Sequence, residues 1–167
     1  EEGEPPHKGE EMLANIGGLL DRARAAGAPV IFVRHADEWM APGTPGFEVH
    51  PAIPPRPDEV IIDKRACDAF CETPLGDLLE SLDVTRLVIT GMQTDYCVDS
   101  ASRSALHRGY DVLLAKDAHS TVGNGIMTAE QIIAHHNQTL SNLPRPGFGI
   151  TAIPSAEIDF APATAAG

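Results

Sequence analysis

The stretch Gly91-Met92-Gln93-Thr94-Asp95-Tyr96-Cys97-Val98-Asp99-Ser100 marks the point where an apolar run gives way to a helical pattern. The run directly before it, residues 87–90 (Leu-Val-Ile-Thr), predicts a buried strand of a parallel sheet. Thr94 and Asp95 are good helix N-caps, and small and apolar residues then recur at helical spacing. We therefore expect Cys97 in or beside the first helical turn, at the carboxyl end of a strand.

That position suits a nucleophilic cysteine. Free N–H groups and the positive end of the helix dipole favour a thiolate there and can bind an oxyanion. Lys64 follows the apolar run 60–62, so its ammonium would reach the same edge of a parallel sheet and favour the thiolate further. The alternatives are a free cysteine that only fills the core and a solvated surface lysine.

The composition narrows the class of protein. The 167 residues include 24 acidic and 12 basic side chains, for a net charge of −12. This balance argues against nucleic-acid and membrane partners, and no apolar run approaches the ~18 residues of a membrane span. The three cysteines cannot all pair, and no signal segment opens the sequence, so we expect reduced thiols in a cytoplasmic protein.

Apolar runs and helical stripes alternate along the sequence. Helices are expected over 12–23, 73–82, about 94–107 and 128–140, and strands over 30–33, 60–62, 87–90, 112–115 and 149–153. This order predicts a single domain over 1–167, with a loop or frayed end at 1–9 and a tail at 161–167. The fold class is a three-layer α/β/α arrangement around a doubly wound, mainly parallel sheet. Ligands of such sheets bind at the carboxyl ends of the strands, where His35, Lys64 and Cys97 would converge.

Several segments together carry a resemblance to a known family. Lys64 and the segments 69–75 (AFCETPL), 91–100, 109–112 (GYDV) and 117–121 (DAHST) resemble the isochorismatase-like cysteine hydrolases. That superfamily includes nicotinamidases and related small-molecule amidases. The resemblance runs from about residue 12 to residue 160, nearly the whole sequence.

The resemblance implies a catalytic triad of Asp, Lys and Cys, in which Lys64 and Cys97 match the family lysine and nucleophile. It also implies a cis peptide bond between Met92 and Gln93. The oxyanion hole would be formed by the backbone N–H groups of Gln93 and Cys97. Members of the family form dimers or tetramers, so a homodimer or homotetramer is expected.

One feature of the family has no counterpart in this sequence. The family's first strand, which ends in the catalytic Asp, would precede the helix at 12–23 and lie in the middle of the sheet. Without it, two neighbouring strands would keep unpaired backbone edges. Glu1, Glu2 and Glu4 do not follow an apolar strand, so we assign none of them as the base. We expect that strand in the complete protein; the alternative is a truncated, inactive member.

The expected activity is hydrolysis of an amide-type C–N bond of a small molecule through a Cys97 thioester, without a cofactor. The alternatives are a vinyl-ether hydrolase of the isochorismate type, which would not need Cys97, and a non-catalytic member that keeps the fold. The candidate pocket walls are aromatic, and the alternative for each is a place in the core; they are Tyr96, Trp39, Phe70 and Phe47.

We predict no metal site. Nicotinamidases of the superfamily bind a metal through an Asp-x-His pair, whereas this sequence has the reversed order His35-Ala36-Asp37, with His50 further along. His35 is instead expected to hydrogen-bond at the strand end or to shape the pocket. Cys67 and Cys71 lack the second pair of ligands that a structural zinc site needs.

Two further histidine motifs suggest alternatives. Asp117-Ala118-His119 also follows a strand, so a Cys–His–Asp triad with His119 as the base is chemically reasonable. The resemblance gives that role to Lys and Asp instead. His135 and His136 point about 100° apart on their helix, and packing or a subunit contact is the expected role.

Overall fold

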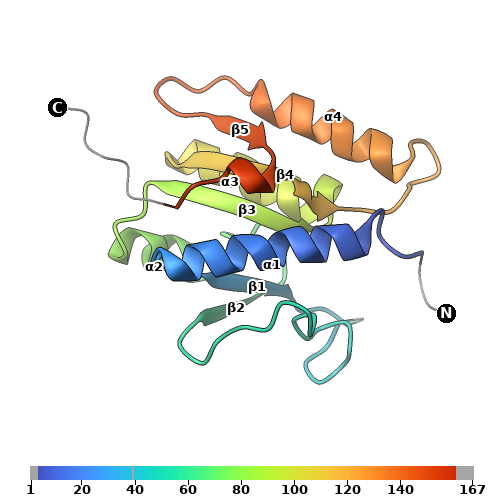
Figure 1. Cartoon of the computed structure of the whole chain (residues 1–167), viewed down its shortest axis with the longest axis horizontal. Coiled ribbons are helices and arrows are strands. Elements are labelled where there is room, and N and C mark those ends of the chain that lie inside the picture. Colours follow the sequence, from blue (N-terminus) through green and yellow to red (C-terminus); the bar gives the residue numbers. More distant parts are fainter. Residues whose placement is uncertain (1–3, 39, 161–167) are drawn as a thin grey trace.

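Helices and strands alternate along the chain and pack in three layers (Figure 1). The computed structural model describes residues 4–38 and 40–160. The elements in chain order are α1 (Gly9–Ala25), β1 (Ile31–His35), β2 (Val60–Lys64), α2 (Leu75–Ser81), β3 (Arg86–Met92), η1 (Thr94–Val98), α3 (Asp99–Arg108), β4 (Asp111–Ser120), α4 (Ala129–Ser141), β5 (Ile150–Ile153) and η2 (Ser155–Glu157).

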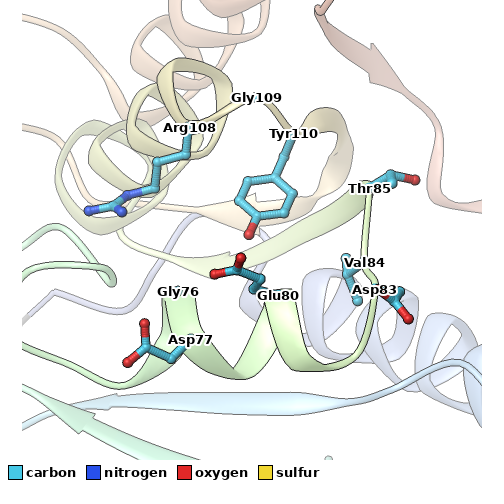
Figure 2. Close-up of a pocket in the computed structure, with 9 residues that line it drawn as sticks. All are labelled: Gly76, Asp77, Glu80, Asp83, Val84, Thr85, Arg108, Gly109 and Tyr110. Carbon is cyan, nitrogen blue, oxygen red and sulfur yellow. The ribbon is translucent and has the colours of Figure 1, made fainter.

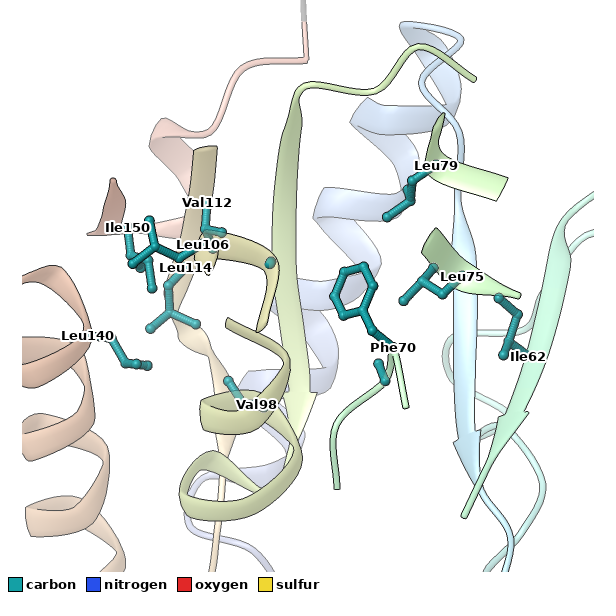
Figure 3. Close-up of a cluster of buried hydrophobic side chains, with 12 residues drawn as sticks. Ile62, Phe70, Leu75, Leu79, Val98, Leu106, Val112, Leu114, Leu140 and Ile150 are labelled. Carbon is teal, nitrogen blue, oxygen red and sulfur yellow. The ribbon is translucent and has the colours of Figure 1, made fainter. Parts of the chain in front are cut away.

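The strands β3 and β4 carry apolar side chains on both faces, as expected for the middle of a covered parallel sheet. On one face Ile89 and Leu114 pack with α2, α3 and α4, as Figure 3 shows for Leu114 and its neighbours. On the opposite face Val88 and Leu113 pack against α1. Successive residues of a strand point to opposite faces, so one apolar run fills both cores. The three-layer prediction is confirmed.

The parallel sheet is divided into two parts. β1 pairs with β2 in register from Ile31 opposite Val60 to His35 opposite Lys64, and β3, β4 and β5 form a second parallel sheet. Within residues 4–38 and 40–160 no strand pairing joins β1 to β3. In Figure 1, α1 passes between these two strands in the view. The edge of β1 away from β2 and the edge of β3 away from β4 therefore have no strand partner among the described residues.

The end of β4 differs from the prediction. The strand continues to Ser120, although the polar residues after 115 predicted its end. Polar side chains remain in the strand because distant residues satisfy them: Asp117 accepts hydrogen bonds from the N–H and the hydroxyl of Ser155. The strand end also holds the N-terminal segment, since His7 N donates to Thr121 O at 3.0 Å. The described part of residues 1–9 is therefore anchored rather than frayed.

The helix ends follow the sequence signals at two places. Thr128 caps α4 through a full capping box with Gln131, and Gly109 ends α3 in the left-handed conformation with φ 96°. Among the described residues no helix is both long and apolar enough to span a membrane.

Candidate active site

Lys64 and Cys97 meet at the carboxyl ends of two strands that are distant in sequence. Lys64 is the last residue of β2, and Cys97 lies in η1, directly after β3. The distance from Lys64 Nζ to Cys97 Sγ is 3.1 Å. Lys64 is only 5% exposed, whereas Cys97 is half-buried, so the thiol reaches solvent and the ammonium is enclosed. An ammonium at this distance favours the thiolate, the reactive form of a cysteine.

The Lys64 ammonium has two further partners. It donates to the carbonyl oxygen of Ala66 at 2.6 Å and lies 3.2 Å from Nδ1 of His35. The other ring nitrogen of His35 lies 3.3 Å from Oδ2 of Asp37. No carboxylate of the described residues lies within salt-bridge distance of Lys64 itself. Glu4 is exposed, and Glu1 and Glu2 lie outside the described residues.

The turn that carries Cys97 is a short π-helix that runs directly into α3. The Met92–Gln93 peptide bond before it is cis, as the resemblance implied. The prediction of Thr94 or Asp95 as an N-cap was wrong, because both side chains bind residues at the end of β4 instead. Thr94 Oγ1 lies 2.8 Å from Nδ1 of His119, and the Thr121 hydroxyl donates to Asp95 at 2.6 Å. Single-turn π segments are frequent at functional sites.

His119, near the end of β4, contacts this turn through the side chain of Thr94. It is 3% exposed, and its Nε2 lies 3.0 Å from Oδ1 of Asn137 on α4. Since an amide oxygen only accepts, Nε2 carries the proton and Nδ1 accepts from Thr94. Burial lowers the pKa of His119, in spite of the opposing hydrogen bond with Asn137. The side-chain contacts of His119 are therefore with Thr94 and Asn137 rather than with Cys97.

The four aromatic candidates occupy different environments. Tyr96, next to Cys97, is 53% exposed and free to contact a ligand. Phe47 is buried with the Arg34 guanidinium 4.1 Å from its ring centroid. Phe70 is buried in the core cluster, where it stacks on Tyr110 at 6.2 Å. Trp39 lies outside the described residues.

The residues considered for metal binding do not gather. In the described part of the chain no three His, Cys, Asp or Glu side chains are placed to hold an ion. His35 pairs with Asp37, while His50 Nδ1 accepts the N–H of Ala52. Cys67 and Cys71 are both exposed.

A hollow in the surface lies at the opposite edge of the sheet (Figure 2). Its lining comes from α2 and from the residues before β3 and β4, including Glu80, Thr85 and Tyr110. Neither Lys64 nor Cys97 lines it. The candidate active site is therefore identified by the contact between the thiol and the ammonium, not by this hollow in the surface.

Comparison with known proteins shows the family of this chain. The model of the isochorismatase domain matches residues 1–135. The chain belongs to the isochorismatase family. A solved structure described as an isochorismatase family protein superimposes on it with a TM-score of 0.83 at 30% identity, covering 92% of this chain and 90% of that one.

Two curated relatives of the isochorismatase family carry hydrolase names. A streptothricin hydrolase of Streptomyces noursei is 45% identical over 115 residues, which are 67% of this chain and 46% of that protein. A ureidoacrylate amidohydrolase of Methylobacterium radiotolerans is 33% identical over 144 residues, 67% of this chain and 56% of the relative. The chain thus spans about half the length of these relatives.

The sequence placed His35 at the same edge as Lys64 and expected it to hydrogen-bond there, but it did not reveal the contact of Thr94 with His119 in this isochorismatase-family site. Both contacts join segments far apart in sequence. The feature of the sequence that could have predicted these contacts is the order of the strands, because parallel strands bring their carboxyl ends to one edge of the sheet.

Proposed function

We propose that this protein is a cysteine hydrolase that cleaves an amide-type C–N bond of a small molecule. The observation that carries the proposal is the 3.1 Å contact between Lys64 Nζ and Cys97 Sγ at the carboxyl edge of the sheet. The hydrolase and amidohydrolase names of the relatives support it. The substrate class is a small molecule, and no cofactor takes part in the steps below.

In the proposed mechanism the Cys97 thiolate attacks the carbonyl carbon, and the Lys64 ammonium stabilises the thiolate before the attack. The backbone N–H groups of Gln93 and Cys97 bind the oxyanion that forms, and each such donor can contribute about 3 kcal/mol in the transition state. The C–N bond then breaks, and the leaving nitrogen takes up, through solvent water, the proton that the Cys97 thiol released when it ionised. Water hydrolyses the thioester, which releases the acid and restores the thiol. Tyr96 is the proposed side wall for the substrate because it is exposed beside Cys97.

The test combines trapping with substitution. An electrophilic amide analogue is incubated with the protein, and peptide mass spectrometry locates the adduct. We expect the adduct on Cys97, and we expect Cys97→Ala to lower amide hydrolysis by about a thousandfold or more, because the covalent route is lost. Release of ammonia or amine from a panel of small amides measures the activity.

Cys67→Ser and Cys71→Ser are the controls, since both cysteines are exposed and have no place in the mechanism. Both variants should keep the adduct and the activity. Adducts only on Cys67 or Cys71 would contradict the proposal. Vinyl-ether cleavage that survives Cys97→Ala would favour the isochorismate-type alternative, and the absence of both activities with an unreactive Cys97 would favour a non-catalytic member.

We also propose assembly as a homodimer or homotetramer. Large apolar side chains exposed on this chain support it, notably Ile126 on the loop before α4 and Phe148 before β5. Light scattering coupled to size-exclusion chromatography measures the molar mass. A mass of one chain at all concentrations would contradict the proposal.

A further inference from the structure

The Lys64 ammonium has three partners among the described residues. An ammonium has three N–H donors and no acceptor. The three groups around Nζ are the Cys97 sulfur at 3.1 Å, the Ala66 carbonyl oxygen at 2.6 Å and His35 Nδ1 at 3.2 Å. Each can accept one hydrogen bond. Because Lys64 is 5% exposed, an N–H without a partner here would be costly.

His35 is placed to be the third acceptor. It ends β1 directly opposite Lys64 in the parallel register, so the backbone fixes the separation of the two side chains. A neutral imidazole accepts at one nitrogen only, and the tautomer decides which one. Nδ1 can accept from Lys64 only when the ring proton is on Nε2.

Asp37 selects that tautomer. Its Oδ2 lies 3.3 Å from His35 Nε2, and a carboxylate at this distance favours the tautomer with the proton on Nε2. The other oxygen, Oδ1, accepts the N–H of Met40 at 2.7 Å, which orients the carboxylate within its own turn. The order of contacts is therefore Asp37, His35, Lys64 and Cys97, with an ion-pair contact of 3.3 Å at the first step and hydrogen-bond contacts at the other two.

We propose that His35, oriented by Asp37, is a positioning residue that holds the Lys64 ammonium against the Cys97 sulfur. This inference rests on the proposed function only in taking Cys97 as the nucleophile. Without an acceptor at His35, one ammonium hydrogen loses its partner and the lysine head turns toward other acceptors or water. The thiolate then loses part of its electrostatic stabilisation, and its reactivity falls.

The test uses the whole protein and iodoacetamide as the probe, at pH 7. His35→Ala and His35→Leu remove the acceptor, whereas His35→Asn restores one, since the amide oxygen of asparagine can take the place of Nδ1. His107→Ala is the matched control because His107 is exposed at the end of α3. Peptide mass spectrometry reports the alkylation rate of Cys97 separately from those of Cys67 and Cys71, and thermal unfolding reports folding.

We expect the Cys97 alkylation rate to fall about tenfold in His35→Ala and His35→Leu, because a change of this size corresponds to the loss of one hydrogen bond to a charged group. His35→Asn should stay within about threefold of the parent, and His107→Ala should match it. The conservative variant separates positioning from packing, because a purely structural role would not be restored by an acceptor atom.

Two outcomes would overturn the inference. One is a folded His35→Ala or His35→Leu variant whose Cys97 reacts within twofold of the parent. The other is a His35→Asn variant that loses as much reactivity as His35→Ala. Alkylation needs no substrate, so a failure of the amide screen would contradict the proposed function and leave this comparison valid.

Discussion

At the scale of single residues, the polar side chains around Cys97 are held by specific partners rather than by solvent. Thr94, His119 and Asn137 form a chain of hydrogen bonds that starts one turn before Cys97 and ends on α4. His119 acts there as a neutral ring that accepts from one partner and donates to the other. Its burial, and the lowered pKa that follows from it, make this contact sensitive to acid.

We expect His119 to make the stability depend on pH between 7 and 5. The unfolded imidazole takes up a proton near pH 6.5, whereas the buried ring, with its lowered pKa, takes one up only at lower pH. The free energy of unfolding therefore falls as the pH falls below about 6.5, by at most about 1.4 kcal/mol per pH unit for one proton. Urea unfolding at pH 7, 6 and 5 measures this slope.

His119→Asn should reduce that slope, because asparagine does not titrate and still offers an acceptor to Thr94. His107→Asn is the control, since an exposed histidine should leave the slope unchanged. An equal slope in His119→Asn and the parent would show that the pH dependence comes from other groups.

At the scale of elements, α4 contributes to the site although none of its residues belongs to it. Asn137 reaches His119 from this helix, and the capping box at Thr128 fixes where the helix begins. Ile132 and Leu140, both buried, fix the face that it presents to the sheet. The position of α4 therefore depends on an N-cap and an apolar face that are visible in the sequence, while its link through His119 to the turn that carries Cys97 depends on the fold.

Thr128→Ala is expected to destabilise the protein by about 1 kcal/mol, because the N-cap hydroxyl that accepts from Gln131 N is lost. Urea unfolding measures the change. Thr139→Ala in the same helix is the control and should cost less, because its hydroxyl caps no backbone group and alanine is the better helix former. A similar loss in both variants would contradict a specific capping effect.

At the scale of the whole molecule, side chains connect the two parts of the sheet. β1 and β2 have no strand pairing with β3 in the described chain, yet Lys64 must stay within reach of Cys97. Arg24 at the end of α1 binds the carboxylate of Glu59, the residue before β2, with two hydrogen bonds of 2.7 and 2.8 Å. This pair joins the helix that covers β3 and β4 to the strand that carries Lys64.

We expect a double-mutant cycle of Arg24→Ala and Glu59→Ala to give a coupling of about 1–2 kcal/mol at pH 7, because the pair is bidentate and largely buried. The hydrogen bond from Arg24 lowers the pKa of Glu59 below its usual 4.5. The coupling is therefore complete above pH 4.5 and is lost as the pH falls through the lowered value.

The exposed pair Lys8 and Glu11, 3.5 Å apart, serves as the control for this cycle and should show a smaller coupling at pH 7. Unfolding by urea at pH 7 and pH 4 gives both values. A coupling for Arg24 and Glu59 no larger than that of the control pair would mean that other contacts hold the β1–β2 pair in place.

Most of the fold could be predicted from sequence because its signals are local. Apolar runs marked the strands, and Thr128 and Gly109 marked helix ends. The predictions that were wrong concern polar residues. Thr94 and Asp95 looked like caps, and the mostly polar residues 116–120 looked like the end of β4. The partners of Thr94, Asp95 and Asp117 lie 25 or more positions away in the sequence.

The amino-acid sequence alone determined the three-layer class, the strand that leads to Cys97 and the edge at which Lys64 would lie, because periodicity and strand ends are properties of neighbouring residues. Only the tertiary structure decided which side chains at that edge contact one another. The 3.1 Å approach of Lys64 to Cys97 and the acceptor from His35 depend on strand register, and register follows from the packing of the whole sheet.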